Sequence, residues 1–318
     1  MALRDYLQGE IAQDFADGML SRRDALRRLV MLGMTAPAAA TLIAACGDDG
    51  ANTAPRTTSS PSTSAAGSAA PSTTASSTTA SSTTASSTTA GGATAVAELI
   101  RFKGSTGELQ GAWASAAKPK GSVLVIHENR GLQPHFFALA GRFARDGYAA
   151  LAIDLVSPEG GTASMSEAQA QAALGAAPAE RLLADLRAGL DELARRNAGL
   201  KLGVIGFCFG GGMTWSLLDA GEARLAAAAP FYGPGPAAPD FRKTKAAVLG
   251  VYAELDSRVN ASRPVVEQAL KAAGLTYEIR TFAGADHAFF NDTGTRYNQQ
   301  AATQAYAAVL DWFGRYLV

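Results

Sequence analysis

The stretch LGVIGFCFGGG, residues 202–212, constrains the fold of this 318-residue chain more than any other. Its apolar start predicts a buried strand, and residues 213–218 can begin a helix with an apolar face. A tight turn between strand and helix would expose the Cys208 side chain and leave no room for a Cβ atom at Gly206 or Gly210. Cys208 is therefore a candidate nucleophile, although a buried structural cysteine beside a Gly-rich loop would give the same pattern.

The first 45 residues have the composition of a secretory signal peptide. A basic segment at 21–28 precedes an uncharged stretch that ends in small residues and is too short and Pro-interrupted for a comfortable membrane span. The paired Arg22 and Arg23 resemble a twin-arginine signal, the type that exports folded protein, although Ala25 stands where a bulky apolar residue is usual. We expect residues 1–45 to lie outside the fold.

The signal ends in IAAC, residues 43–46, which resembles a bacterial lipobox. Cleavage there would make a diacylated Cys46 the mature amino terminus and anchor the protein to a membrane, as an exported lipoprotein of the cell envelope. An ordinary signal peptide with a chance cysteine is the alternative. The chain has two cysteines. One lipid site and one nucleophile account for both, so no disulfide is expected.

Residues 46–95 separate this signal from the rest of the chain. Beyond residue 50 they are almost wholly Ser, Thr, Ala, Gly and Pro, with a five-residue repeat over 72–90. Such a segment cannot bury enough apolar surface to offset its ordering entropy, and we predict a disordered tether. The 28 basic and 28 acidic residues of the chain balance, so no nucleic-acid partner is expected.

The remaining 223 residues, 96–318, are long enough for one sizeable core. Strand-like and helix-like segments alternate, which predicts an α/β fold with a mostly parallel, doubly wound sheet flanked by helices and an antiparallel start. Sites in such sheets lie at the carboxyl ends of strands. The expected strands are 99–103, 109–115, 122–127, 149–154, 202–207, 226–232, 246–252 and 276–282, and the expected helices are 134–146, 178–197, 209–220, 263–273 and 298–316.

A cysteine nucleophile needs a base, because a thiol with a pKa of about 8.5 is only a few per cent thiolate at neutral pH. Of the three histidines, His127 ends a predicted strand, His135 opens a helix, and His287 follows the last strand. The chain order nucleophile, acid, histidine is typical of the α/β-hydrolase arrangement. Cys208, Asp256 and His287 fit that order, each after a predicted strand.

Several short motifs resemble the dienelactone hydrolase family, and together they cover nearly the whole of 96–318. They are VIHENRG at 125–131, GFCFGGG at 206–212, FYG at 231–233, the Asp256 segment at 252–259, ADHAF at 285–289, NDT at 291–293 and RYN at 296–298. The resemblance implies an α/β-hydrolase fold and cleavage of a small ester or lactone, as by carboxymethylenebutenolidases. It implies no cofactor. The signal and the tether lie outside it.

By this resemblance Cys208 is the nucleophile, His287 is the base and later the acid, and Asp256 orients the imidazole. Glu254 and Asp286 are rival acids that we rank below Asp256. The resemblance also makes Glu128 the glutamate that approaches the resting thiol and helps form the thiolate. A solvated carboxylate at a strand end is the alternative for Glu128.

The backbone N–H groups of Asn129 and Phe209 match the family's oxyanion hole. Other positions depart from the family, whose founding members hold a substrate carboxylate with two arginines. The first of these positions is Asn291 here, and the second segment reads DLVSP at 154–158. We therefore do not expect activity on dienelactone itself. Arg130 could substitute for the lost arginines, and the candidate pocket residues are Arg130, Tyr232 and Asn291.

The few histidines and the lack of a Cys/His cluster argue against a zinc site, so we expect neither a metal nor an organic cofactor. Two other classes stay open. A noncatalytic surface module would tolerate loss of the triad, and a thiol redox sensor would use Cys208 without Asp256, but it lacks a resolving cysteine in the mature domain. The sequence gives no indication of the oligomeric state.

Overall fold

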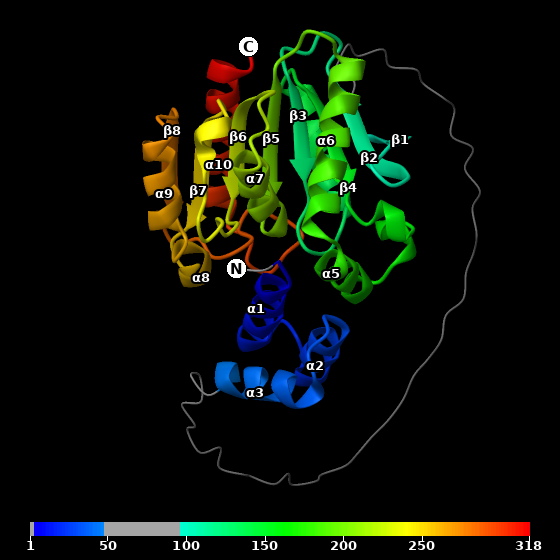
Figure 1. Ribbon diagram of the computed structural model, residues 1–318, viewed down its shortest axis with the longest axis vertical. Coiled ribbons are helices and arrows are strands. Elements are labelled where there is room, and N and C mark those ends of the chain that lie inside the picture. The colour runs from blue at the N-terminus through cyan, green and yellow to red at the C-terminus, as the bar shows by residue number, and fades with distance from the viewer. Residues whose placement is uncertain (1–2, 48–95) are drawn as a thin grey trace, which may run out of the picture.

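A computed structural model of the protein describes residues 3–47 and 96–318, and Figure 1 shows an α/β domain preceded by three short helices. Eight strands form one sheet in the order β1-β2-β4-β3-β5-β6-β7-β8. Strand β2 is antiparallel to β1 and β4, and the pairs from β4 to β8 are parallel. The strands are β1 (Glu98–Lys103), β2 (Glu108–Ser115), β3 (Ser122–Ile126), β4 (Ala149–Asp154), β5 (Leu202–Phe207), β6 (Leu225–Phe231), β7 (Ala247–Ala253) and β8 (Tyr277–Phe282).

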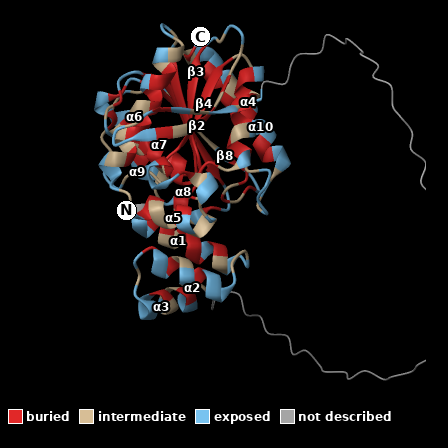
Figure 2. Cartoon of the chain, turned by 90° about the vertical axis from the view of Figure 1, so that its right-hand side faces the viewer, coloured by how far each residue is buried: buried red, intermediate tan, exposed pale blue. Residues whose placement is uncertain are grey.

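Helices cover both faces of the sheet, with α4 and α10 on one side and α6, α7 and α9 on the other (Figure 2). Strands β3, β4 and β5 are buried along their whole length, as central parallel strands should be. The helices of this domain are α4 (Pro134–Arg145), α5 (Glu167–Ala176), α6 (Ala179–Arg196), α7 (Phe209–Asp219), α8 (Ser257–Asn260), α9 (Arg263–Ala272) and α10 (Gln299–Tyr316), with short 3₁₀ turns at Ser157–Glu159, Thr162–Ser164 and Phe241–Lys243.

The predicted fold class is confirmed, and every predicted strand and helix lies within about one residue of an observed one. Helices α5 and α8 are not predicted. Helix α5 is Ala- and Gln-rich and lacks a clear apolar stripe, so its start depends on a capping box between Ser166 and Gln169. The predicted tether at 46–95 lies outside the described residues, apart from residues 46 and 47.

In the uncut chain, residues 3–47 do not stand apart from the fold, and the signal peptide at 1–45 stays a prediction. This segment forms α1 (Leu3–Ala16), α2 (Arg22–Met31) and α3 (Ala36–Gly47), which pack on one another, while α1 and α2 also contact α5. Apolar side chains drive this packing, because Leu7, Ile11 and Leu29 are buried. We call residues 3–47 the leader. None of the helices in the described ranges is long and apolar enough to cross a membrane.

The turn between β5 and α7 is tight, as the sequence predicts. A Cβ atom built on Gly206 would lie 2.0 Å from the Gly210 carbonyl oxygen, and one built on Gly210 would lie 2.3 Å from the Ile126 carbonyl oxygen. Both contacts are with backbone, which cannot move aside cheaply. Glycine at these two positions allows α7 to start directly against the ends of β3 and β5.

Gly210→Ala is therefore expected to lower the free energy of unfolding by about 3 kcal/mol or more. Gly314→Ala in α10 is the matched control, because a Cβ atom there meets nothing within 4 Å. This control should raise stability by about 0.5–1 kcal/mol, the usual gain from alanine in a helix. Urea unfolding followed by circular dichroism measures both. Equal effects of the two substitutions would contradict the close approach at Gly210.

Candidate active site

Cys208 occupies the turn after β5 in a strained backbone conformation, with φ 55° and ψ −117°. In the described part of the chain, three non-glycine residues have positive φ: Cys208, Tyr232 and Ala288. Each lies just after the C-terminal end of a strand or in the loop that follows the strand. Strained residues of this kind persist where the surrounding structure fixes them, and they cluster at functional sites.

His287 and Asp256 form a directed pair beside this turn. His287 Nδ1 lies 2.5 Å from Asp256 Oδ2, and both side chains are buried. Asp256 Oδ1 accepts from the Val259 N–H at 3.1 Å, which fixes the carboxylate. Because Asp256 can only accept, Nδ1 carries a proton and Nε2 faces the cleft. A ring nitrogen of His287 and the Cys208 Sγ lie within 4.8 Å of each other.

The two rival acids lie elsewhere. Glu254 is exposed and accepts from the Gly284 N–H at 2.8 Å. Asp286 accepts from the backbone N–H of His287 at 2.6 Å and lies 3.7 Å from Arg296. The structure thus brings together Cys208, His287 and Asp256, the three residues that the sequence ranks first.

The charge balance at this site favours a protonated imidazole. Burial alone lowers the pKa of His287, but the negative charges of Cys208 and Asp256 outweigh it and raise the pKa to about 10. At neutral pH the imidazole is therefore held as an imidazolium beside the sulfur. The site therefore holds a positive charge beside Cys208, the environment that a nucleophilic cysteine needs.

Glu128 lies beyond β3 and is buried at 8% exposure. Its carboxylate accepts from the Tyr232 hydroxyl at 3.3 Å and from the Asn291 side-chain amide at 2.8 Å. Burial and the neighbouring charges of Glu128 and Cys208 raise the pKa of Tyr232 well above its ordinary value, so its hydroxyl remains a donor. In this state Tyr232 and Asn291 hold Glu128, whereas the groups that contact the thiol come from the leader.

The two residues whose backbone N–H groups are expected at an oxyanion hole, Phe209 and Asn129, both belong to the region of Cys208. Phe209 is the first residue of α7, so its N–H belongs to the turn that has no partner within the helix. Asn129 follows Glu128 and lines the same cavity as Cys208. The loop that carries Asn129 is tied down by His127, whose Nδ1 lies 2.6 Å from the Glu128 carbonyl oxygen.

His127 is held neutral, because its Nε2 accepts from the Leu155 N–H at 3.1 Å. Burial lowers the pKa of His127 below 6.5 and outweighs the nearby carboxylates. Below a pH of about 6.5, His127 therefore takes up a proton in the unfolded chain but stays neutral in the folded one. As the pH falls further, the free energy of unfolding decreases by up to about 1.4 kcal/mol per pH unit from this residue. In urea unfolding between pH 7 and 5, His127→Asn should show a shallower decline than the wild type. Parallel curves would contradict this assignment.

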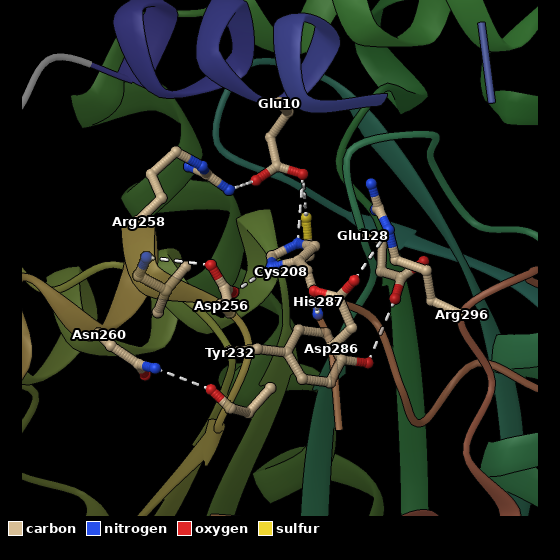
Figure 3. Close-up of polar contacts among 12 residues, drawn as sticks. Glu10, Glu128, Cys208, Tyr232, Asp256, Arg258, Asn260, Asp286, His287 and Arg296 are labelled. Atoms are coloured by element: carbon tan, nitrogen blue, oxygen red, sulfur yellow. Dashed lines mark hydrogen bonds and ion pairs between the residues drawn. The ribbon is translucent and has the colours of Figure 1, made fainter. Parts of the chain in front are cut away.

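Two residues that the sequence does not place at the site contact the thiol, and two arginines pair with the helix that carries them. Tyr6 Oη lies 3.2 Å from Cys208 Sγ. Glu10 Oε2 lies 3.7 Å from the same sulfur and 3.2 Å from His287 Nε2 (Figure 3). Arg258 pairs with Glu10, and Arg296 pairs with Asp14 at 3.2 Å. The acidic spacing Glu10, Asp14, Asp17 in a helical segment is the one signal in the sequence that points to a charged helix face.

A cavity of about 400 Å³ opens at this point, lined by groups from both the leader and the α/β domain, among them Glu10, Asn129, Arg130, Cys208, His287 and Asn291. Arg130 reaches Asp14 at 3.6 Å. Glu10, Cys208 and His287 also form the one close group of three potential metal ligands within the described ranges. They coincide with the candidate catalytic residues, and the expectation of no metal stays a prediction. Cys46 ends the leader in α3 and is partly exposed.

Comparison with known proteins agrees with this geometry. The sequence profile of the dienelactone hydrolase family matches residues 109–317. A Saccharolobus solfataricus protein provisionally named a carboxymethylenebutenolidase is 30% identical over 238 residues, covering 64% of this chain and 92% of that protein. A Synechocystis protein with the same provisional name is 33% identical, covering 60% and 84%. A crystal structure from Klebsiella pneumoniae, provisionally titled a dienelactone hydrolase, superposes with a TM-score of 0.62 at 28% identity, covering 70% of this chain and 99% of that one. With the eight-stranded sheet and the profile match over most of its length, the chain belongs to the dienelactone hydrolase family and is a hydrolase of the carboxylic-ester type.

Proposed function

We propose that this protein hydrolyses a small ester or lactone through an acyl-thioester on Cys208. The observation that carries the proposal is the directed chain Asp256–His287–Cys208, in which the acid fixes the imidazole and the imidazolium faces the sulfur. The same arrangement of acid, histidine and nucleophile performs acyl transfer on several unrelated folds. The family membership of the chain supports the reaction class.

In the proposed reaction the Cys208 thiolate attacks the ester carbonyl carbon, and the backbone N–H groups of Asn129 and Phe209 bind the resulting oxyanion. His287 gives its Nε2 proton to the departing alkoxide, which leaves as the alcohol. His287 then takes a proton from water as the water attacks the thioester, and the carboxylic acid is released with the thiol group restored. Asp256 holds Nδ1–H throughout. Water is the only co-reactant.

We further propose that Glu128 assists formation of the thiolate once a substrate displaces the groups now at the sulfur. Its hydrogen bonds to Tyr232 and Asn291 hold the carboxylate ready beside the same cavity. Arg130, Tyr232 and Asn291 are then residues of the substrate pocket. These assignments depend on the resemblance of VIHENRG at 125–131 to the family motif.

A panel of aryl esters, lactones and dienelactone, with burst kinetics and intact mass measurement, tests the reaction. We expect steady turnover of at least one aryl ester or lactone and an acyl adduct that maps to Cys208. Weak or no turnover of dienelactone is expected, because Asn291 replaces an arginine of the founding enzymes. An acyl adduct on any other residue would contradict the mechanism.

We also propose that the protein is an exported lipoprotein, carried by the twin-arginine motif and anchored through Cys46. The support is sequence alone, namely Arg22-Arg23, the uncharged segment and the lipobox at 43–46. Metabolic labelling with a fatty acid in a bacterial host tests it. The wild type should incorporate label and partition with membranes, and Cys46→Ala should do neither. Equal labelling of the two proteins would overturn lipidation at Cys46.

A further inference from the structure

Helix α1 of the leader lies against the C-terminal ends of the parallel strands, directly over the candidate catalytic residues (Figure 3). Tyr6, Glu10 and Asp14 are each at most 4% exposed, although they belong to a segment with the composition of a removable signal peptide. Because buried hydroxyl and carboxylate groups are costly without partners, these three side chains need hydrogen bonds or ion pairs. The partners all come from the α/β domain.

Three of the four carboxylates in α1 and the turn after it pair with three arginines that come from separate segments of the domain. Glu10 pairs with Arg258 in α8, Asp17 pairs with Arg296, and Asp14 lies 3.2 Å from Arg296. Asp14 also lies 3.6 Å from Arg130, beyond β3. Charges of opposite sign thus face one another at Glu10, Asp14 and Asp17, which is the pattern of a specific docking surface.

Apolar packing supports the same position. A Cβ atom built on Gly175 of α5 would lie 2.4 Å from Leu32 Cδ2 and 3.3 Å from Leu7 Cδ1, so this glycine admits the leader closely. The Arg258 guanidinium lies 4.8 Å from the centre of the Tyr6 ring, within the range of a cation–π contact. The docking surface therefore combines shape, apolar contact and charge.

The docked helix occupies the space that a substrate carbonyl must enter. Tyr6 Oη lies 3.2 Å from the Cys208 sulfur, within hydrogen-bond distance. Burial together with the negative charge of Cys208 raises the pKa of Tyr6 well above 10, so its hydroxyl keeps its proton. Glu10 Oε2 lies 3.2 Å from His287 Nε2, the atom that has to reach a leaving group. Neither the sulfur nor Nε2 is free to meet a substrate.

We propose that the carboxyl edge of the sheet is a docking surface for the chain's own leader, and that docked α1 blocks Cys208 and His287 with Tyr6 and Glu10. The uncut chain is then inhibited, and loss of the leader opens the site. Arg22 and Arg23 remain exposed while α1 is docked, so the blocked form still presents the pair that resembles an export signal. The blocking of the thiol does not depend on the proposed ester hydrolysis, although its effect on turnover does.

The full chain with Cys46→Ala, which leaves Cys208 as the one thiol, is the starting protein for the test. Glu10→Lys places a cation opposite Arg258 and the His287 imidazolium and should expel α1. Asp5→Lys is the matched control, because it makes the same charge change at an exposed position of the same helix. The first readout is the second-order rate of Cys208 alkylation by iodoacetamide, and the second is kcat/KM for the best aryl ester.

We expect Glu10→Lys to raise the alkylation rate at least about 10-fold over both the starting protein and Asp5→Lys, because only the undocked fraction reacts. The value of kcat/KM should rise by a similar factor. Faster alkylation without ester turnover would uphold the docking and count against the proposed reaction. Equal alkylation rates in all three proteins, or a loss of turnover in Glu10→Lys with unchanged alkylation, would overturn the inference.

A peptide of residues 3–45, which lacks Cys46, added to the Glu10→Lys protein gives a second measurement that does not depend on how that variant folds its leader. The wild-type peptide should slow Cys208 alkylation in a saturable manner. The same peptide with Glu10→Lys should slow it far less. Equal slowing by both peptides, or none by either, would overturn the role of Glu10.

Discussion

Cys208→Ala is expected to lower kcat/KM for the best ester by at least about 10⁴-fold, equivalent to about 5.5 kcal/mol of transition-state stabilisation. The physical reason is that the strained turn holds the sulfur, the candidate nucleophile, close to the His287 imidazole. The residual rate comes from binding and the oxyanion hole alone. Stopped-flow and steady-state assays measure this loss, together with the disappearance of the acyl adduct.

Two controls separate this result from its alternatives. Cys46→Ala removes the other thiol and should leave turnover unchanged, since Cys46 is in α3 at the end of the leader. The Cys208→Ala substitution should also be made in the Glu10→Lys chain, so that a docked leader does not hide the comparison. Turnover by Cys208→Ala within 10-fold of its parent in that background would exclude the proposed acyl-thioester.

Asp256→Asn is expected to lower kcat by about 10²–10⁴-fold. The carboxylate accepts from His287 Nδ1 at 2.5 Å, whereas an amide can turn its own N–H groups toward the ring and favour the wrong tautomer. The substitution also removes one of the charges that raise the pKa of His287 to about 10. The limb of the pH–rate profile that reports the imidazolium should therefore shift to lower pH.

Glu254→Gln is the matched control for the loss of a carboxylate. Glu254 follows the same strand but is exposed and contacts the Gly284 N–H, away from the imidazole. We expect its kcat and its pH profile to match those of the wild type. A larger loss in Glu254→Gln than in Asp256→Asn would show that the acid of the triad has been assigned to the wrong residue.

The sequence predicts the α/β domain well because its signals are local. The continuous apolar runs at β3, β4 and β5 mark buried parallel strands, and the glycines around Cys208 mark the tight turn. The chain order of nucleophile, acid and histidine then places all three at one edge, because parallel strands align their carboxyl ends. Helices α5 and α8 are not predicted, because they are short and weakly patterned.

The position of the leader has no such local signal. Its composition is that of a signal peptide, and nothing along the chain indicates that it returns to the site. The Glu10–Arg258 contact joins residues 248 positions apart, and the Asp14–Arg296 contact joins residues 282 positions apart. No periodic pattern encodes a pairing between such distant segments.

The sequence by itself thus determined the sheet, the turn at Cys208 and the order of the three candidate catalytic residues. Only the tertiary structure decided which groups contact the thiol. It places Tyr6 and Glu10 there, with Arg258 and Arg296 as partners of α1, and it ties Glu128 to Tyr232 and Asn291. The physical reason is that strands, helices and turns depend mainly on residues close together in the sequence. Which segment occupies a cleft depends on the shape and charge of side chains that come from distant parts of the chain.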